Sequence, residues 1–230
     1  MTAEELLQFT HTLGISRDQI LREEMEMEFL NQLAAHKLGA RVIFYGGTAL
    51  RLAYGSPRFS EDIDLLLTKP IPFRVFATFM KDVIKKHPLW MIGDIKEKRN
   101  TLFSLIVISD EKLKHHFSVK IEIHKSSQPL DVSTHLALLK SPVSIAEPLL
   151  LVPLLSELKQ LKEEALAERQ KARDLFDLWY IAQSMRVPFS PPRNKGVYTR
   201  RGFKNELRVF LPRTFYPVID QLYDSITKKN

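Results

Sequence analysis

The sequence predicts an α+β protein in which a small mixed β-sheet flanked by helices is followed by a C-terminal helical domain. Residues 1–125 contain short β-branched and aromatic runs separated by turn and helix signals. From about Ser144 the strand patterns vanish, and neither proline nor glycine interrupts residues 154–187. We therefore expect a sheet domain with N-terminal helices at 1–140 and a helical domain with a basic tail at 141–230.

The first predicted element is an amphipathic helix. Ser16 and Gln19 have the spacing of a capping box, which marks the start of a helix. Gly39 ends the helical pattern. The apolar stripe at helical spacing consists of Leu21, Met25, Phe29 and Leu33.

A strand, a glycine turn and a short helix follow. Arg41–Tyr45 is a β-branched and aromatic run that ends at Gly46 and Gly47. Thr48–Tyr54 then has a helical pattern, and Gly55 closes it. Because glycine has no side chain, such a turn lets backbone amides approach a bound group closely.

The rest of the predicted sheet is formed by three strands. Asp62–Leu67 is the first of them, and a helix from about Phe73 to Lys86 follows it and ends before Pro88. Leu102–Ser109 and Phe117–His124 are the other two, and the second alternates between apolar and polar residues.

The basic tail at Arg186–Arg213 holds eight basic residues and one acidic residue. Basic and aromatic residues in alternation can bind RNA through phosphate contacts and base stacking. The same aromatic residues, at helical spacing, can instead pack into a hydrophobic core with the lysines and arginines in solvent around it. The sequence favours neither RNA binding nor core packing. A loop at Met185–Tyr198 could also close over a site. The tail aromatics are Phe189, Tyr198, Phe203 and Phe210.

Composition excludes several classes of protein. The 230 residues are 44% hydrophobic and 27% charged, which is ordinary for a folded globular chain and argues against disorder or a fibrous repeat. The absence of cysteine excludes disulfides, thiolate zinc sites and cysteine nucleophiles. The 34 lysines and arginines against 27 acidic residues give a net charge of +7, which favours polyanionic partners.

Targeting and membrane signals are missing from the sequence. The acidic start at Met1–Glu5 lacks the basic and apolar regions of a secretory signal. The longest apolar run, Leu149–Leu155, is too short to span a membrane and contains Pro153. We expect a cytoplasmic protein with no membrane partner.

Two carboxylates on one strand carry the strongest chemical signal. Asp62 and Asp64 are two residues apart and therefore project from the same face, about 7 Å apart. Such a pair repels unless a cation lies between its members, and oxygen ligands of this kind select Mg²⁺ completed by substrate phosphates. Gly46 and Gly47, before a helix N-terminus, would supply amide donors to a phosphate. The alternative is a plain turn beside solvated acids, which the combined pattern disfavours.

The segment GGTALRLAYGSPRFSEDIDL at residues 46–65 resembles the first motif of the AbiEii/AbiGii toxin nucleotidyltransferases, within the DNA polymerase β-like superfamily. The resemblance is close over residues 44–67. A third acid is expected on a later strand, and Glu122 supplies it, although Glu122 alone would read as an exposed charge. We expect His124 to be a neighbour rather than a ligand, because oxygen ligands suit Mg²⁺ better than imidazole.

Two further segments match the family downstream. Lys162–Arg169 resembles its K-x-x-A-L-x-x-R element, and Arg173–Leu178 resembles R-D-L-Y-D-L with Phe176 in place of tyrosine. On one continuous helix, Lys162, Arg173 and Asp177 would share a stripe. The alternative is a solvated face with weak Arg–Asp pairs. The resemblance favours a role in binding phosphate and organising the site.

The resemblance thus implies a nucleotidyltransferase-like fold and a transfer reaction that uses a nucleoside triphosphate (NTP) and two Mg²⁺ ions, with Mn²⁺ as an alternative. Asp62, Asp64 and Glu122 would bind metal, and these acids and Lys162 would be the catalytic residues. The expected nucleotide- and phosphate-binding residues are Gly46, Gly47, Thr48, Arg58, Ser60, Arg169, Arg173, Asp174 and Asp177.

The family also implies the toxin of a toxin–antitoxin pair, with the 3′ end of tRNA as the expected acceptor and a cognate antitoxin as a partner. Three alternatives remain: a non-catalytic nucleotide- or RNA-binding module on the same fold, transfer to a protein hydroxyl, and transfer to a small molecule. The intact acid set argues against the first. The basic charge disfavours a pocket for a cationic small molecule.

Overall fold

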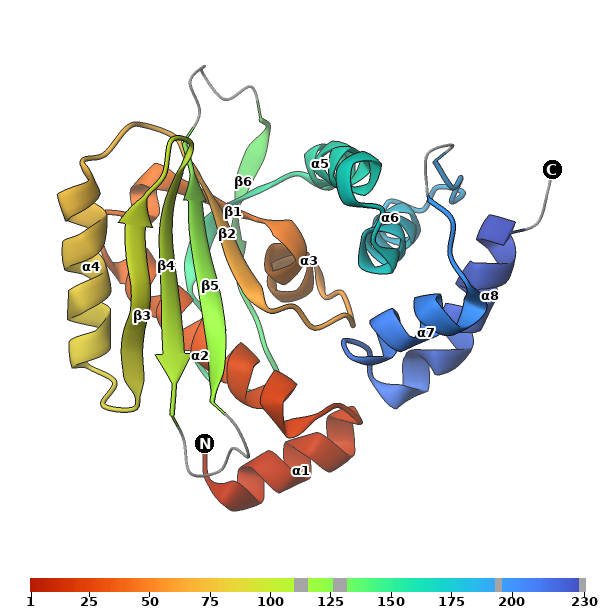
Figure 1. Cartoon of the computed structure of the whole chain (residues 1–230), viewed down its shortest axis with the longest axis horizontal. Coiled ribbons are helices and arrows are strands. Elements are labelled where there is room, and N and C mark those ends of the chain that lie inside the picture. The colour runs from red at the N-terminus through yellow and green to blue at the C-terminus, as the bar shows by residue number, and fades with distance from the viewer. Residues whose placement is uncertain (110–115, 126–131, 193–195, 228–230) are drawn as a thin grey trace.

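A computed structural model describes residues 1–109, 116–125, 132–192 and 196–227 (Figure 1). A mixed sheet has the strand order β1-β2-β5-β4-β3, in which β2 and β5 are parallel and the other neighbours antiparallel. This confirms the predicted small mixed sheet. Its strands are β1 (Val42–Tyr45), β2 (Asp62–Leu67), β3 (Trp90–Glu97), β4 (Thr101–Ile108) and β5 (Phe117–His124).

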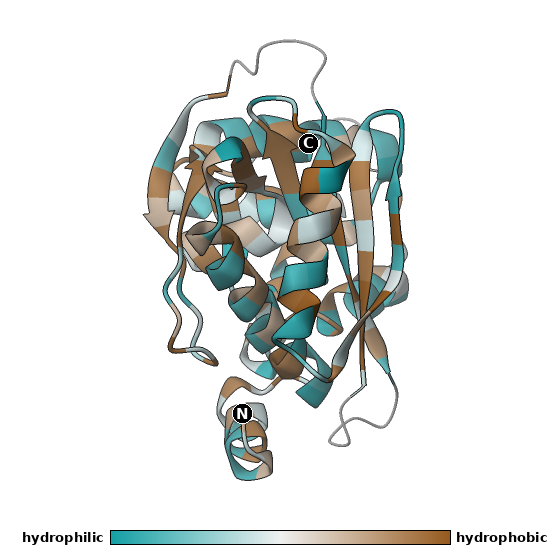
Figure 2. Cartoon of the chain, turned by 90° about the vertical axis from the view of Figure 1, so that its left-hand side faces the viewer, coloured by the Kyte–Doolittle hydropathy of each residue, from teal (hydrophilic) through white to brown (hydrophobic). Residues whose placement is uncertain are grey.

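Helices cover one face of the sheet. Met25 and Phe29 of α2 and Phe76 of α4 are buried in one core with Ile63 and Ile121 of the sheet. In Figure 2, α4 faces the viewer and carries hydrophilic residues on its outer side. The helices of this part are α1 (Ala3–Leu13), α2 (Arg17–Ala35), α3 (Gly46–Tyr54) and α4 (Phe73–Lys85), with a 3-10 turn η1 (Gly39–Arg41) between α2 and β1.

The C-terminal part has its own core, formed by helices. Leu175 and Phe176 of α6 pack there with Leu207 of α7 and Leu222 of α8. The backbone amide of Phe59 donates to the Phe210 carbonyl, at 2.8 Å, and joins this part to the loop before β2. The helices are α5 (Leu155–Arg169), α6 (Ala172–Ser184), α7 (Arg200–Arg208) and α8 (Tyr216–Thr227), with a 3-10 turn η2 (Arg213–Phe215) before α8.

The expectation that strand patterns vanish from about Ser144 is wrong. Strand β7 (Leu149–Pro153) pairs antiparallel with β6 (Thr134–Leu138) in a separate two-stranded sheet. Its run of leucine and valine does not alternate, so periodicity alone does not distinguish a short buried strand from a helix segment. Strand β7 lies beyond residue 140, where we expected only helices, and the division into two domains remains a prediction.

Two other elements escaped the sequence patterns. Helix α1 precedes the helix predicted from Ser16, and its own N-cap, Thr2, accepts a hydrogen bond from the Glu5 amide. Strand β3 contains Gly93, and its register shifts between Ile92 and Asp94. This irregularity breaks the alternation that marks a strand.

Most aromatic residues of the basic tail belong to the helical core. Phe203 is buried in it, and Phe189 and Tyr198 pack against it. Phe210 is also buried. Part of the loop at Met185–Tyr198 lies outside the described residues, so its predicted closure over the site stays a prediction.

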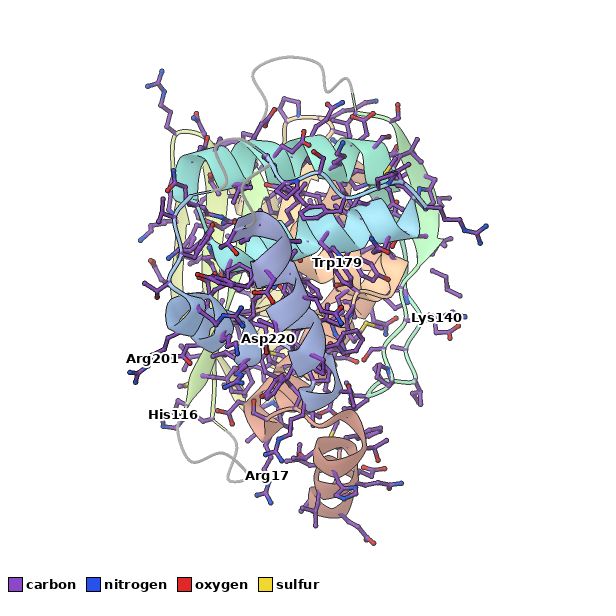
Figure 3. All side chains as sticks on the ribbon, turned by 90° about the vertical axis from the view of Figure 1, so that its right-hand side faces the viewer. Arg17, His116, Lys140, Trp179, Arg201 and Asp220 are labelled. Atoms are coloured by element: carbon purple, nitrogen blue, oxygen red, sulfur yellow. The ribbon has the colours of Figure 1, made fainter. Side chains whose placement is uncertain are left out.

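Acidic residues of the same helices pair with cations of the tail. Arg200 and Lys204 of α7 contact Asp220 of α8 at 2.8 and 2.5 Å. Figure 3 shows Asp220 near the front of this part, and Arg201 on the same side of the molecule as His116. Among the described residues, no helix is both long and apolar enough to cross a membrane.

Candidate active site

The three predicted acids lie on one face of the sheet. Asp64 is paired with Glu122 across the parallel strands β2 and β5, and Asp62 with Lys120. Ile63 and Ile121, whose side chains point to the other face, are fully buried. Because directly paired residues share a face, the two strands bring the acids together although Glu122 is distant in sequence.

The carboxylates of Asp64 and Glu122 and the ring of His124 form a candidate metal site. Each offers one ligand atom, and these atoms lie within 4.8 Å of one another. His124 thus lies within the set, where we expected a neighbour. Asp62 lies outside it, and its Oδ2 is 3.3 Å from the Lys120 ammonium.

Two lysines contact the acids. Lys120 Nζ lies 3.0 Å from Glu122 Oε2, and Lys98 Nζ lies 3.4 Å from Glu122 Oε1. Burial alone would raise the pKa of Glu122, but its hydrogen bond to Lys120 and the attraction of both lysines lower it. Burial, followed by repulsion from Asp62, raises the pKa of Asp64. The site therefore disfavours the charged form of Asp64, and an added cation beside it would stabilise that form.

The glycine pair at the start of α3 is pressed against the site. A Cβ atom on Gly46, whose φ is +85°, would lie 2.5 Å from Asp64 Oδ2. A Cβ atom on Gly47 would lie 2.4 Å from Arg58 Nη2 and 2.9 Å from Ser60 Oγ. Any side chain at either position would therefore displace a charged or polar group of the site.

Thr48 and Ser60, two predicted phosphate-binding residues, also lie at this junction. The Thr48 hydroxyl donates a hydrogen bond to the Asp62 carbonyl, which ties α3 to the start of β2. Ser60 faces Gly47. The structure therefore brings the glycine pair, Thr48 and Ser60 beside the acids.

A network of charges, four of whose five members are buried, joins the two downstream segments to Arg58. Arg58 Nε and Nη2 donate to the two oxygens of Asp177 at 2.6 and 2.7 Å, and both side chains are buried. Lys162 Nζ is 2.6 Å from Asp177 and 3.5 Å from Asp174. Arg169 donates to both oxygens of Asp174 at 2.8 and 2.7 Å. Five predicted site residues are thus held together.

This network does not arise from one continuous helix. Gln170, with a φ of +47°, separates α5 from α6, so the proposed stripe along a single helix is wrong. The break turns Asp174 back towards Arg169. Within the described residues, the Arg173 side chain takes no part in this network, and its backbone amide donates to Glu206 at 3.2 Å.

Sequence reasoning missed two residues around the acids. Lys120 alternates with Ile121, so the period of two places it on the face of Glu122, as it does His124. Tyr45 was not signalled: its ring meets that of His124 edge to face, with centroids 6.0 Å apart. Burial, then Asp64 and Glu122, raise the pKa of Tyr45.

Comparison with known proteins now identifies the family. A family model described as "Nucleotidyl transferase AbiEii toxin, Type IV TA system" matches residues 28–210. The chain belongs to the AbiEii nucleotidyltransferase toxin family. The matched residues include both sides of the site, from β2 to the acids of α6.

Solved structures show the same fold for this AbiEii protein. MenT4, a nucleotidyltransferase toxin from Mycobacterium tuberculosis, has a TM-score of 0.63 at 15% identity, covering 100% of this chain and 91% of its own. JHP933 from Helicobacter pylori has a TM-score of 0.54 at 20% identity, covering 92% of this chain and 79% of its own. A search of curated proteins found no match. Family and fold therefore agree with the resemblance seen in the sequence.

Proposed function

We propose that this AbiEii protein transfers a nucleoside monophosphate from an NTP to an acceptor hydroxyl, in a reaction that needs Mg²⁺ and releases pyrophosphate. The observation that carries the proposal is the contact of the glycine turn with the acids: Gly46 lies against Asp64, and Gly47 lies against Arg58 and Ser60. Backbone amides that could bind phosphate therefore adjoin carboxylates that could bind metal.

The donor set fits a hard divalent cation. Asp64 and Glu122 offer oxygen ligands, His124 adjoins them, and Asp62 lies on the same face. We propose Asp62, Asp64 and Glu122 as the protein ligands for two Mg²⁺ ions, with Mn²⁺ as a substitute. Bound metal would polarise the phosphoryl group and lower the pKa of the attacking hydroxyl.

The rest of the site would bind and orient the triphosphate. The amides at the start of α3 would donate to phosphate oxygens, since the Gly47 backbone is not covered by a side chain of its own. The network contains three cations, the buried Arg58 and Lys162 and the half-exposed Arg169, against two buried carboxylates. This excess favours binding of phosphate charge, and Lys162 is close enough to Asp64 to lower its pKa by attraction.

In this proposal Lys162 and Arg169 stabilise the charge that develops on the phosphates, as fixed positive groups do in phosphoryl transfer. Asp174 and Asp177 position these cations. Arg58 is fully engaged, because Nη1 also donates to the Phe59 carbonyl at 2.9 Å. We propose that the sheet domain at 1–140 binds the metal and the helical domain at 141–230 completes the phosphate site.

The proposed acceptor is the 3′ end of tRNA in the cytoplasm. The net charge of +7 supports a polyanionic acceptor. The toxin family implies a nucleotide substrate and a cognate antitoxin. A protein hydroxyl is the second acceptor class to test.

Mass spectrometry of total RNA and total protein tests the proposal. The wild type, Asp64→Asn and the matched control Asp82→Asn would each be incubated with the four NTPs, Mg²⁺ and a cell extract that contains both RNA and protein. Asp82 is exposed on α4, remote from the acids. We expect added nucleotides on RNA with the wild type and the control, and none with Asp64→Asn. Undiminished transfer by Asp64→Asn would contradict the metal assignment. Transfer by the wild type only to protein would show that the acceptor is a protein hydroxyl and not RNA.

A further inference from the structure

One face of the sheet is not covered by helices next to the acids. In Figure 1 no helix lies in front of β3, β4 and β5, whereas α2 lies behind them. The residues of β4 that point to this face, Phe103, Leu105 and Val107, are partly exposed. Those that alternate with them, such as Leu102 and Ile106, are fully buried in the core.

Phe103 continues this face directly from the candidate metal site. It is paired with Glu122 across β4 and β5, and with Lys96 across β3 and β4. Neighbouring strands lie about 4.8 Å apart. A row of three side chains thus leads from a catalytic acid to an aromatic ring and then to a lysine.

Two ammonium groups surround the Phe103 ring. Lys98 Nζ lies 4.1 Å and Lys96 Nζ 5.1 Å from the ring centroid. Lys98 also contacts Glu122 Oε1 at 3.4 Å. Lys96 pairs with Asp94 at 2.5 Å, and both of these side chains are partly exposed. An exposed pair of this kind contributes about 0–1 kcal/mol, so a phosphate can compete for the lysine at little cost. We name Lys96, Lys98, Phe103 and Leu105 the Phe103 face.

The position of the phosphate site leaves this face for the acceptor. Gly47 follows β1, and Lys162 lies on α5; both are on the β1 side of the acids (Figure 1). In phosphoryl transfer the attacking and leaving oxygens lie roughly in line across the phosphorus. If the triphosphate lies on the β1 side, the attacking hydroxyl arrives from the β4 side, where the Phe103 face is.

We propose that the Phe103 face binds the single-stranded 3′ end of an RNA acceptor, with a terminal base stacked on Phe103 and backbone phosphates bound by Lys96 and Lys98. This inference rests on the proposed nucleotidyl transfer and adds a location for its acceptor. An aromatic ring on an open sheet face, flanked by cations, is the arrangement by which proteins bind unpaired bases.

Fluorescence anisotropy with the full chain tests this proposal. The probe is a 5′-labelled RNA hairpin with a four-nucleotide single-stranded 3′ end, and a blunt hairpin serves as its comparison. Phe103→Leu removes the ring, and Phe103→Tyr retains it. Lys96→Gln combined with Lys98→Gln removes two charges, and the matched control is Lys81→Gln combined with Lys86→Gln, both exposed on or just after α4.

We expect Phe103→Leu to weaken binding of the overhang about 5- to 150-fold, the range for one stacked base, and Phe103→Tyr to restore it. The Lys96 and Lys98 double variant should reduce the salt slope by about 1.4, because each phosphate contact on a single strand contributes about 0.7. The control pair should behave as the wild type. NTP affinity, measured by calorimetry, should be unchanged in Phe103→Leu.

Three results would overturn the inference. Equal affinity of Phe103→Leu and wild type for the overhang would exclude stacking. Equal salt slopes for the two lysine double variants would exclude the phosphate contacts. If Phe103→Leu bound RNA as the wild type does but no longer transferred nucleotide to a protein, the face would belong to a protein acceptor. Failure of the wild type to bind NTP would instead contradict the proposed function, while the RNA measurements would still decide the role of the face.

Discussion

Replacing Asp177 by asparagine removes a carboxylate that two buried cations share. Arg58 binds both of its oxygens, at 2.6 and 2.7 Å, and Lys162 lies 2.6 Å away. Asp177 is 0% exposed, Arg58 3% and Lys162 6%. Removing one partner of a buried ion pair costs about 3–5 kcal/mol, because the other charge stays buried without compensation. Since two cations lose their partner, we expect a cost in the upper half of this range.

Urea unfolding and thermal melting measure this cost. For a chain of this size each kcal/mol lowers Tm by about 2–4 °C, so Asp177→Asn should lower Tm by roughly 8–20 °C. The matched control is Asp82→Asn on α4, whose ion pair with Lys85, at 3.8 Å, is exposed. It should lose at most about 1 kcal/mol. A loss below 1 kcal/mol for Asp177→Asn would refute the argument from burial.

The pH dependence adds a second test. Burial would raise the pKa of Asp177, but attraction to Arg58 and Lys162 and their hydrogen bonds lower it. A carboxyl whose folded pKa is lowered contributes its stability above its unfolded pKa of about 3.9 and loses it as pH falls through the folded value. The stability difference between wild type and Asp177→Asn should therefore be constant near neutral pH and shrink below about pH 4. A difference that grew in acid would contradict the sign.

Three further variants test other parts of the structure. Gly47→Ala should raise the KM for NTP and cost about 1–3 kcal/mol of stability, because its Cβ would collide with the Arg58 guanidinium, which Asp177 holds in place. Wild-type kinetics would contradict the close contact. Glu26→Gln should stabilise the protein at pH 7 and lose this advantage towards pH 4, because burial, followed by repulsion from Glu23, raises the pKa of Glu26 and makes its ionised form costly in the folded protein. Urea unfolding at both pH values measures the difference, and equal stability of the variant and the wild type at pH 7 would count against it. Gln170→Gly should raise Tm by about 2–4 °C, since the φ of +47° costs a non-glycine residue about 1 kcal/mol.

The two strands that carry the acids could be predicted because Phe117–His124 alternates cleanly and Asp62–Leu65 alternates between acids and apolar residues. Asp62–Leu67 and Phe117–His124 were predicted with the bounds that the structure has. Alternation also placed Asp62, Asp64 and Glu122 on the polar sides of their strands. It could not show that β2 and β5 are parallel neighbours, because strand pairing depends on packing across the whole chain. The register that pairs Asp64 with Glu122 is therefore a result of the structure.

The contacts of the downstream segments could be predicted less well. Helical periodicity treats residues 162–177 as one rod, whereas Gln170 in a left-handed conformation starts a new helix. Propensity gives no sign of such a break, because glutamine is a good helix former. The partner of Asp177 was equally hidden, since Arg58 lies 119 residues away in the sequence.

The two parts of the family resemblance meet at this ion pair. Arg58 belongs to the first motif, four residues before Asp62, and Asp177 belongs to the last, on α6. The Arg58 guanidinium donates to the Phe59 carbonyl and to the Asp177 carboxylate, and it lies directly against Gly47. An arginine held from both sides fixes the glycine turn relative to Lys162, because Asp177 binds both cations. The motif residues therefore connect the sheet to the C-terminal helices in addition to forming the site. The distance from the glycine turn to Lys162 depends on Asp177.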